Sequence, residues 1–162
     1  MLTTSHYHLA QINISKAIAP LDTPLLKGFV DRLDEINALA EEQPGFVWRL
    51  IGEDNNATDI TWSDDPLVII NMSVWQTPEH LSRFVYQTKH VELLAQRSQW
   101  FKTMNTPHMA LWWIPTGHIP SIAEAKERME HLKIHGPTPF AFTFKDKIPP
   151  DNYYRSEEST CI

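Results

Sequence analysis

The residues best suited to chemistry lie in one stretch of the chain, residues 67–115. Asn71 and Trp75 stand in an apolar run that predicts a strand, and because strand side chains alternate, both belong to one face. An amide that holds an oxyanion and an indole that stacks on a ring suit a pocket for a flat organic molecule. The same residues also suit a well-packed core, and residue types alone leave both interpretations open.

A predicted helix from residue 77 to about residue 101 follows this strand. It carries His90 and Tyr86, and either side chain can transfer a proton. With a rise of about 1.5 Å per residue in the helix and about 3.3 Å in the strand, His90 reaches the depth of Asn71. The apolar stripe of the helix and the side that carries His90 both look buried, so the helix must be rotated, kinked or covered by another element. The side chains predicted to bind a substrate are Gln11, Asn13, Phe84, Arg97 and Trp112.

Three histidines offer a different kind of site. If the fourth strand pairs with the first and runs against it, His118 falls near His6 and His8. Imidazoles of this number can bind zinc or copper. The sequence places no carboxylate to complete such a site, so no metal is assigned to the predicted catalytic residues.

Composition narrows the classes of protein. The chain has 162 residues, 42% of them hydrophobic, and a formal net charge of −6, which indicates a globular protein and argues against nucleic-acid binding. The lone Cys161 cannot form an internal disulfide. No apolar run approaches the length of a membrane span, and the first residues do not resemble a signal peptide. We therefore expect a cytoplasmic protein that does not associate with membranes.

The order of predicted elements indicates the fold. Strands are expected at residues 6–15, 46–51, 67–75 and 107–115, and helices at residues 24–40, 77–101 and 121–133. Thr23–Pro24, Thr77–Pro78 and Ser121 provide helix starts. The order β-α-β-β-α-β predicts an α+β, ferredoxin-like fold, with the third helix and a short strand at residues 140–144 added. Residues 1–145 are expected to form one domain and residues 146–162 a polar, flexible tail.

The strands look apolar on both faces, whereas a ferredoxin-like sheet has helices on one face only. A second copy of the chain would cover the bare face. The sequence therefore predicts a homodimer.

Several runs also carry a resemblance to a known family. The runs are 71–75, 84–86, 89–90, 97–101, 111–115, 117–120, 136–139 and 141–144. Over residues 6–145 the chain resembles an uncharacterised bacterial and fungal domain family in the dimeric α/β-barrel superfamily of antibiotic-biosynthesis-monooxygenase-like proteins. The superfamily includes cofactor-independent oxygenases of polycyclic phenols, polyketide cyclases, haem-degrading oxygenases, haem enzymes and muconolactone-isomerase-type proteins.

The resemblance implies an enzyme of secondary metabolism that acts on a hydrophobic, aromatic or polyketide-like molecule. It would be a cofactor-independent monooxygenase or a cyclase or isomerase. In some of the oxygenases an Asn and a Trp position the substrate, and Asn71 with Trp75 is similar. In the haem members a helix histidine binds iron, which makes a haem protein with His90 as ligand the first alternative. A non-catalytic ligand-binding or dimerisation module is the second.

Overall fold

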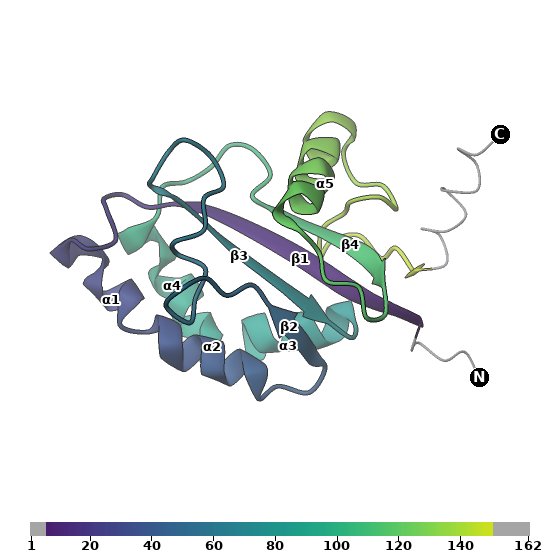
Figure 1. Ribbon diagram of the computed structural model, residues 1–162, viewed down its shortest axis with the longest axis horizontal. Helices are drawn as coiled ribbons and strands as arrows, with labels where there is room; N and C mark the ends of the chain where they lie inside the picture. The colour runs from purple at the N-terminus through teal and green to yellow at the C-terminus, as the bar shows by residue number, and fades with distance from the viewer. Residues whose placement is uncertain (1–5, 151–162) are drawn as a thin grey trace.

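A four-stranded antiparallel sheet forms the centre of the computed structural model, which describes residues 6–150 (Figure 1). Its strands are β1 (Tyr7–Lys16), β2 (Phe46–Arg49), β3 (Val68–Trp75) and β4 (Met109–Pro115). They lie in the order β2-β3-β1-β4, which is the ferredoxin-like arrangement that the sequence predicts. Asn13 of β1 faces both Asn71 of β3 and Met109 of β4.

One face of the sheet is covered by short helices (Figure 1). The first connection forms the 3-10 helix η2 (Pro24–Leu26), α1 (Lys27–Val30) and α2 (Leu33–Glu41). The connection after β3 forms α3 (Pro78–Gln87) and α4 (His90–Trp100). Both helices predicted to be continuous are therefore interrupted. Thr77 caps α3 as expected, since its side chain accepts a hydrogen bond from the His80 amide, whereas Thr23 makes no such cap.

The break between α3 and α4 occurs at Thr88, which has an extended backbone. Its hydroxyl donates to the Phe84 carbonyl at 2.6 Å and accepts from the His90 amide at 3.2 Å. One side chain thus ends α3 and provides a hydrogen bond to the first turn of α4. Of the three alternatives left open by the sequence, the structure shows the kinked helix, and His90 lines the cavity although it lies off the apolar stripe of α3.

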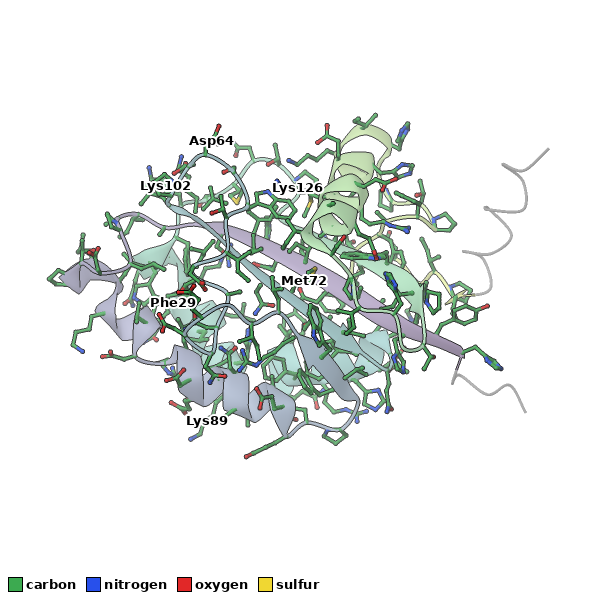
Figure 2. All side chains as sticks on the ribbon, in the orientation of Figure 1. Phe29, Asp64, Met72, Lys89, Lys102 and Lys126 are labelled. Carbon is green, nitrogen blue, oxygen red and sulfur yellow. The ribbon has the colours of Figure 1, made fainter. Side chains whose placement is uncertain are left out.

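The opposite face of the sheet is covered by α5 (Ile122–His135) (Figure 1). Ser121 caps this helix, since its hydroxyl accepts from the Glu124 amide at 3.1 Å, as predicted. Met129 of α5 and Met72 of β3, which Figure 2 labels at the centre of the sheet, belong to one buried cluster. The loop between β2 and β3 adds Ile60 to it.

This coverage corrects the reasoning behind the predicted homodimer. Residues of the sheet that face α5 are almost completely buried within one chain, including Ile12, Val74 and Trp112. The sheet has helices on both faces, so no bare apolar face calls for a second copy. A homodimer stays a prediction, without this reason for it.

The predicted strand at residues 140–144 is wrong. Phe142 makes a single bridge to β4, with two backbone hydrogen bonds to Leu111 at 2.8 and 2.9 Å. The chain then continues along the same edge, where the Ile148 carbonyl accepts from the Trp113 indole at 2.8 Å. Ile148 of the predicted tail thus packs against the sheet edge, whereas residues 151–162 lie outside the described part, so a flexible tail stays a prediction. None of the helices within residues 6–150 has the length and apolar character that a bilayer crossing requires.

Candidate functional site

A cavity of about 300 Å³ lies between the sheet and the helices α1–α4. Strands β1 and β3 form its floor, the helices form its roof, and residues 56–58 of the loop before β3 close one side. It brings together every predicted site residue except Trp112: Gln11, Asn13, Asn71, Trp75, Phe84, Tyr86, His90 and Arg97.

A chain of hydrogen bonds crosses the floor of the cavity. The Gln11 amide nitrogen donates to Asn71 Oδ1 at 2.6 Å and to Ser73 Oγ at 2.7 Å, and the Trp75 indole donates to the same Ser73 Oγ at 2.9 Å. Because Ser73 Oγ accepts two bonds, its own proton is left to donate. Because Asn71 accepts through its oxygen, its Nδ2 is left to donate as well. The floor therefore offers hydrogen-bond donors to a ligand.

Trp75 has a different role in this structure from the predicted one. Its ring stacks on Phe84 with the centroids 5.3 Å apart and meets the edge of Phe46 at 5.4 Å, and only 1% of the residue is exposed. These neighbours occupy the ring that was expected to stack on a substrate. In this structure Trp75 positions Ser73 through its indole N–H.

His90 is held in one defined state at the break between α3 and α4. Its Nδ1 lies 3.2 Å from the Val85 carbonyl, and since a carbonyl only accepts, Nδ1 carries the proton. Burial lowers the pKa of His90 below its ordinary value of 6.5, so the ring is neutral at pH 7. Its Nε2 has no hydrogen-bond partner among the described residues, which leaves a lone pair that can accept a proton from a ligand.

Arg97 and His108 lie at the other end of the cavity. Arg97, in the last turn of α4, has its guanidinium carbon 5.5 Å from the Phe101 ring centroid. Burial lowers the pKa of Arg97. Burial, together with the positive charge of Arg97, lowers the pKa of His108. Both side chains line the cavity, and His108 is exposed.

The remaining predicted residues lie at the margins or elsewhere. Tyr86 is 54% exposed at the rim and packs against Phe144, with ring centroids 6.1 Å apart. Asn13 lines the cavity and accepts a hydrogen bond from Ser15 at 3.3 Å. Trp112 lies on the α5 face, where its indole donates to Glu124 at 2.8 Å, so it does not contact this cavity.

His6, His8 and His118, the histidines considered as a metal site, do not form such a site. His118 Nε2 lies 2.7 Å from the Glu124 carboxylate, and no group of three or more possible metal ligands occurs within the described residues.

Among the cavity residues absent from the predicted set, Ser73 and His108 carry groups that can bind a ligand. Ser73 shares the face of Asn71 and Trp75 by alternation, and that signal could have included it. His108 precedes β4, which begins at Met109, so alternation does not fix the direction of its side chain.

Comparison with known proteins places the chain in a family but not in a reaction class. The family model described as "Domain of unknown function (DUF3291)" matches residues 8–158, and no curated protein matches. Solved structures with a similar fold are only distantly similar. SnoaB, a cofactor-independent oxygenase from Streptomyces nogalater, is 14% identical with a TM-score of 0.45, over 65% of this chain and 90% of SnoaB.

Two other structures are similar to the same degree. A protein of unknown function from Nitrosomonas europaea is 11% identical with a TM-score of 0.46, over 72% of this chain and 98% of that one. The protein PA3566 from Pseudomonas aeruginosa is 13% identical with a TM-score of 0.46, over 74% of this chain and 100% of that one. Similarity at this level does not assign an activity.

Proposed function

We propose that this chain, which belongs to the DUF3291 family, is an enzyme whose active site is the cavity between the sheet and α1–α4. The observation that carries the proposal is the pairing of a neutral His90, with a free Nε2, and a floor of hydrogen-bond donors in one cavity of about 300 Å³. The substrate is a flat, largely apolar molecule, of aromatic or polyketide-like type, with a phenol or an enolisable carbonyl group.

His90 acts as the general base. Its Nε2 takes a proton from an O–H, or from a C–H next to a carbonyl, and the electron pair stays on the substrate as an oxyanion. The Nδ1–H bond to the Val85 carbonyl holds the ring in the tautomer that this step needs. Burial keeps the ring unprotonated and ready to accept at neutral pH.

The oxyanion is stabilised by the donors of the floor. Asn71 Nδ2 and the Ser73 hydroxyl point their protons away from the bonds that fix them, and both are held in advance by Gln11. Donors that are already oriented stabilise a developing negative charge without reorganisation. Gln11 and Trp75 are positioning residues in this scheme.

The resulting enolate or phenolate can react at carbon, as a carbanion, in two ways. In an oxygenase, the CH₂ carbon that carries this negative charge takes one oxygen atom of O₂ as a carbonyl group, and its two hydrogens leave with the other oxygen atom as water. The substrate supplies both electron pairs, so no external reductant is consumed. In a cyclase or isomerase the same carbanion attacks a carbonyl of the substrate or is protonated at another carbon.

Haem binding is favoured by one observation only, the free Nε2 of His90. The cavity volume of about 300 Å³ is at the lower end of pockets that hold drug-sized molecules, and a tetrapyrrole is larger than these. The helices would have to move apart to admit a haem, so no step of the proposed chemistry depends on it. A Soret band that appears when haem is added, and disappears in His90→Gln, would support this alternative.

Deuterium exchange tests the proposed proton transfer without knowledge of the natural substrate. The probes are 2-tetralone and anthrone, two flat ketones with acidic C–H groups, and exchange is followed by NMR in D₂O. We expect the wild-type protein to accelerate exchange, and His90→Gln to lower the rate by about 100-fold or more. The amide of Gln can still donate to the Val85 carbonyl, which preserves the local contact.

Two further variants complete the test. Asn71→Ala should also lower the rate while the melting temperature changes little, because Asn71 is exposed to the cavity. Arg83→Gln, an exposed change on α3 outside the cavity, should leave the rate unchanged. If His90→Gln and Asn71→Ala change only the melting temperature, the two residues belong to a core. The second alternative, a non-catalytic ligand-binding or dimerisation module, then applies.

A further inference from the structure

We infer that Arg97 and His108 form an anion site at one end of the cavity, and that this site binds a carboxylate group of the ligand. The inference rests on the proposed function in so far as both use the same cavity. It adds the chemical class of the substrate, which is an acid whose apolar body lies between Arg97 and His90.

Arg97 is a cation without a balancing acid. It is partly buried and lines the cavity, and its guanidinium carbon lies 5.5 Å from the Phe101 ring centroid. No ion pair or hydrogen bond joins it to another of the described residues, whereas Arg32, in the same helical layer, pairs with Glu92. A partly buried guanidinium without a carboxylate lacks the compensation that buried charges normally have.

The lining of the cavity contains no acidic residue from the described part of the chain. The chain has 20 Asp and Glu residues against 14 Lys and Arg, yet no Asp or Glu within residues 6–150 lines the cavity. The other Arg that these residues contribute to the lining, Arg49, is neutralised by Glu41 at 2.6 Å and donates to the Asn55 carbonyl at 2.8 Å. The remaining positive charge in an acidic protein is thus that of Arg97, and it faces the cavity.

The strand register places further donors beside this charge. The Ile14 amide bonds to the His108 carbonyl at 2.7 Å, one residue from Asn13, which faces Asn71 across the sheet. Asn71 and His108 therefore belong to neighbouring rows of the sheet, on either side of β1. Asn71, Arg97 and His108, from β3, α4 and the start of β4, all line the cavity.

The opposite end is aromatic and holds the base. Trp75 faces Leu9, four residues along β1 from Asn13, which is about 13 Å at 3.3 Å per residue. Phe84 stacks on Trp75, and His90 lies 5.0 Å from Phe84. Phe29, labelled in Figure 2 on α1, closes the Arg97 end by packing on Phe101 at 4.9 Å. A ligand that spans the cavity has an apolar wall at one end and the cation at the other.

The charge of the site selects a monoanion. A guanidinium binds the two oxygens of a carboxylate with two parallel hydrogen bonds. His108 is a neutral donor at pH 7, because burial and the charge of Arg97 lower its pKa. One positive charge balances one carboxylate, and it leaves a phosphate dianion half uncompensated.

A pair of probes that differ only in charge tests the inference. The ligands are 2-naphthoate and 2-naphthamide, which share the ring and the carbonyl group, and binding is measured by calorimetry at pH 7. We expect the wild-type protein to bind 2-naphthoate at least about tenfold more tightly, the change that one charged hydrogen bond provides. Added KCl should weaken the binding of 2-naphthoate and leave that of 2-naphthamide unchanged.

The variants locate the charge. Arg97→Gln should remove the preference for 2-naphthoate without changing the binding of 2-naphthamide, and Arg97→Lys should restore part of it. Arg83→Gln is the control, since it removes an exposed Arg outside the cavity. The salt dependence of the wild-type protein keeps the test valid if Arg97→Gln does not fold.

The outcomes separate the two proposals. Equal binding of both probes to the wild-type protein would overturn the anion site and leave the cavity as a binding site. A preference for 2-naphthoate that persists in Arg97→Gln would overturn the role of Arg97. If neither probe binds at its solubility limit, the anion site and the proposed ligand cavity both fail.

Discussion

The hydrogen bond from the Trp75 indole to Ser73 is the link on which the geometry of the cavity floor depends. A double-mutant cycle with Trp75→Phe and Ser73→Ala measures it. Phe at position 75 keeps a ring between Phe84 and Phe46 but has no N–H to donate. Ala at position 73 removes the acceptor, while Gln11 keeps its second bond, to Asn71.

The structure predicts unequal effects. Ser73→Ala leaves the indole N–H of a residue that is only 1% exposed without an acceptor, which costs about 1–3 kcal/mol. In the Trp75→Phe background the indole N–H is already absent, so the same Ser73→Ala change strands only the Gln11 N–H that bonds to Ser73 and should cost less. The coupling free energy is expected to be about 0.5–1.5 kcal/mol, the net value of one buried hydrogen bond.

Urea unfolding of the four proteins supplies the free energies. The transition is followed by near-ultraviolet circular dichroism, and equal m-values show that the unfolded states are comparable. Ser15→Ala is the matched control, because Ser15 of β1 is buried on the same face of the sheet as Ser73 but bonds to Asn13 and not to Trp75. Its effect should add to that of Trp75→Phe within about 0.3 kcal/mol. A Ser73–Trp75 coupling as small as this control would refute the proposed fixation of the floor.

Three other predictions follow from the described contacts. Folding lowers the pKa of His90 below 6.5, so between the two pKa values the unfolded chain binds a proton and the folded chain does not. The free energy of unfolding should therefore fall as the pH falls below about 6.5, and it should fall less steeply in His90→Gln. An equal dependence of the free energy on pH in both proteins, measured by urea unfolding, would count against this prediction. Thr88→Ala should cost about 1 kcal/mol through loss of the bond to the His90 amide and should shift the imidazole NMR signals of His90; unchanged signals would show that Thr88 does not set its position. Met129→Ala should lower the free energy of unfolding by about 2–5 kcal/mol. The control Lys133→Ala, an exposed change on the same helix, should lower it by less than about 0.5 kcal/mol. Comparable losses in the two variants would contradict the packing of α5 on the sheet.

The fold and most of the cavity could be predicted because both depend on short-range patterns. Period-two alternation places Asn71 and Trp75 on one face, and the register that pairs Asn13 with Asn71 follows from the antiparallel order of β1 and β3. The helix wheel also showed that a straight helix would leave His90 off the apolar stripe, although it did not choose among rotation, a kink and cover by another element, and it did not place the break at Thr88. These are properties of single elements or of neighbouring strands.

What could not be predicted depends on contacts between elements distant in sequence. The sequence does not show which side of the sheet α5 takes, and that choice removed the reason for a homodimer. The position of α5 also explains why Trp112, which was expected to bind a substrate, packs under this helix instead. The ring of Trp75 was expected to be free, but Phe84 and Phe46 meet there only after folding.

The two faces of strands β1 and β3 differ in polarity, which bears on the choice between a ligand cavity and a plain core. In the middle of the strands, the positions that face α5 are apolar: Ala10, Ile12, Ile14, Ile70, Met72 and Val74. The alternate positions, which face α1–α4, are polar along the middle of the same strands: Gln11, Asn13, Ser15, Asn71 and Ser73. These side chains bond to one another and to the Trp75 indole, so part of their hydrogen-bonding capacity is satisfied without a ligand. The donors left over are Asn71 Nδ2 and the Ser73 hydroxyl, and a dry apolar core above them would leave these two unpaired. The polar row therefore supports the proposal that the space above it holds a ligand with polar groups of its own.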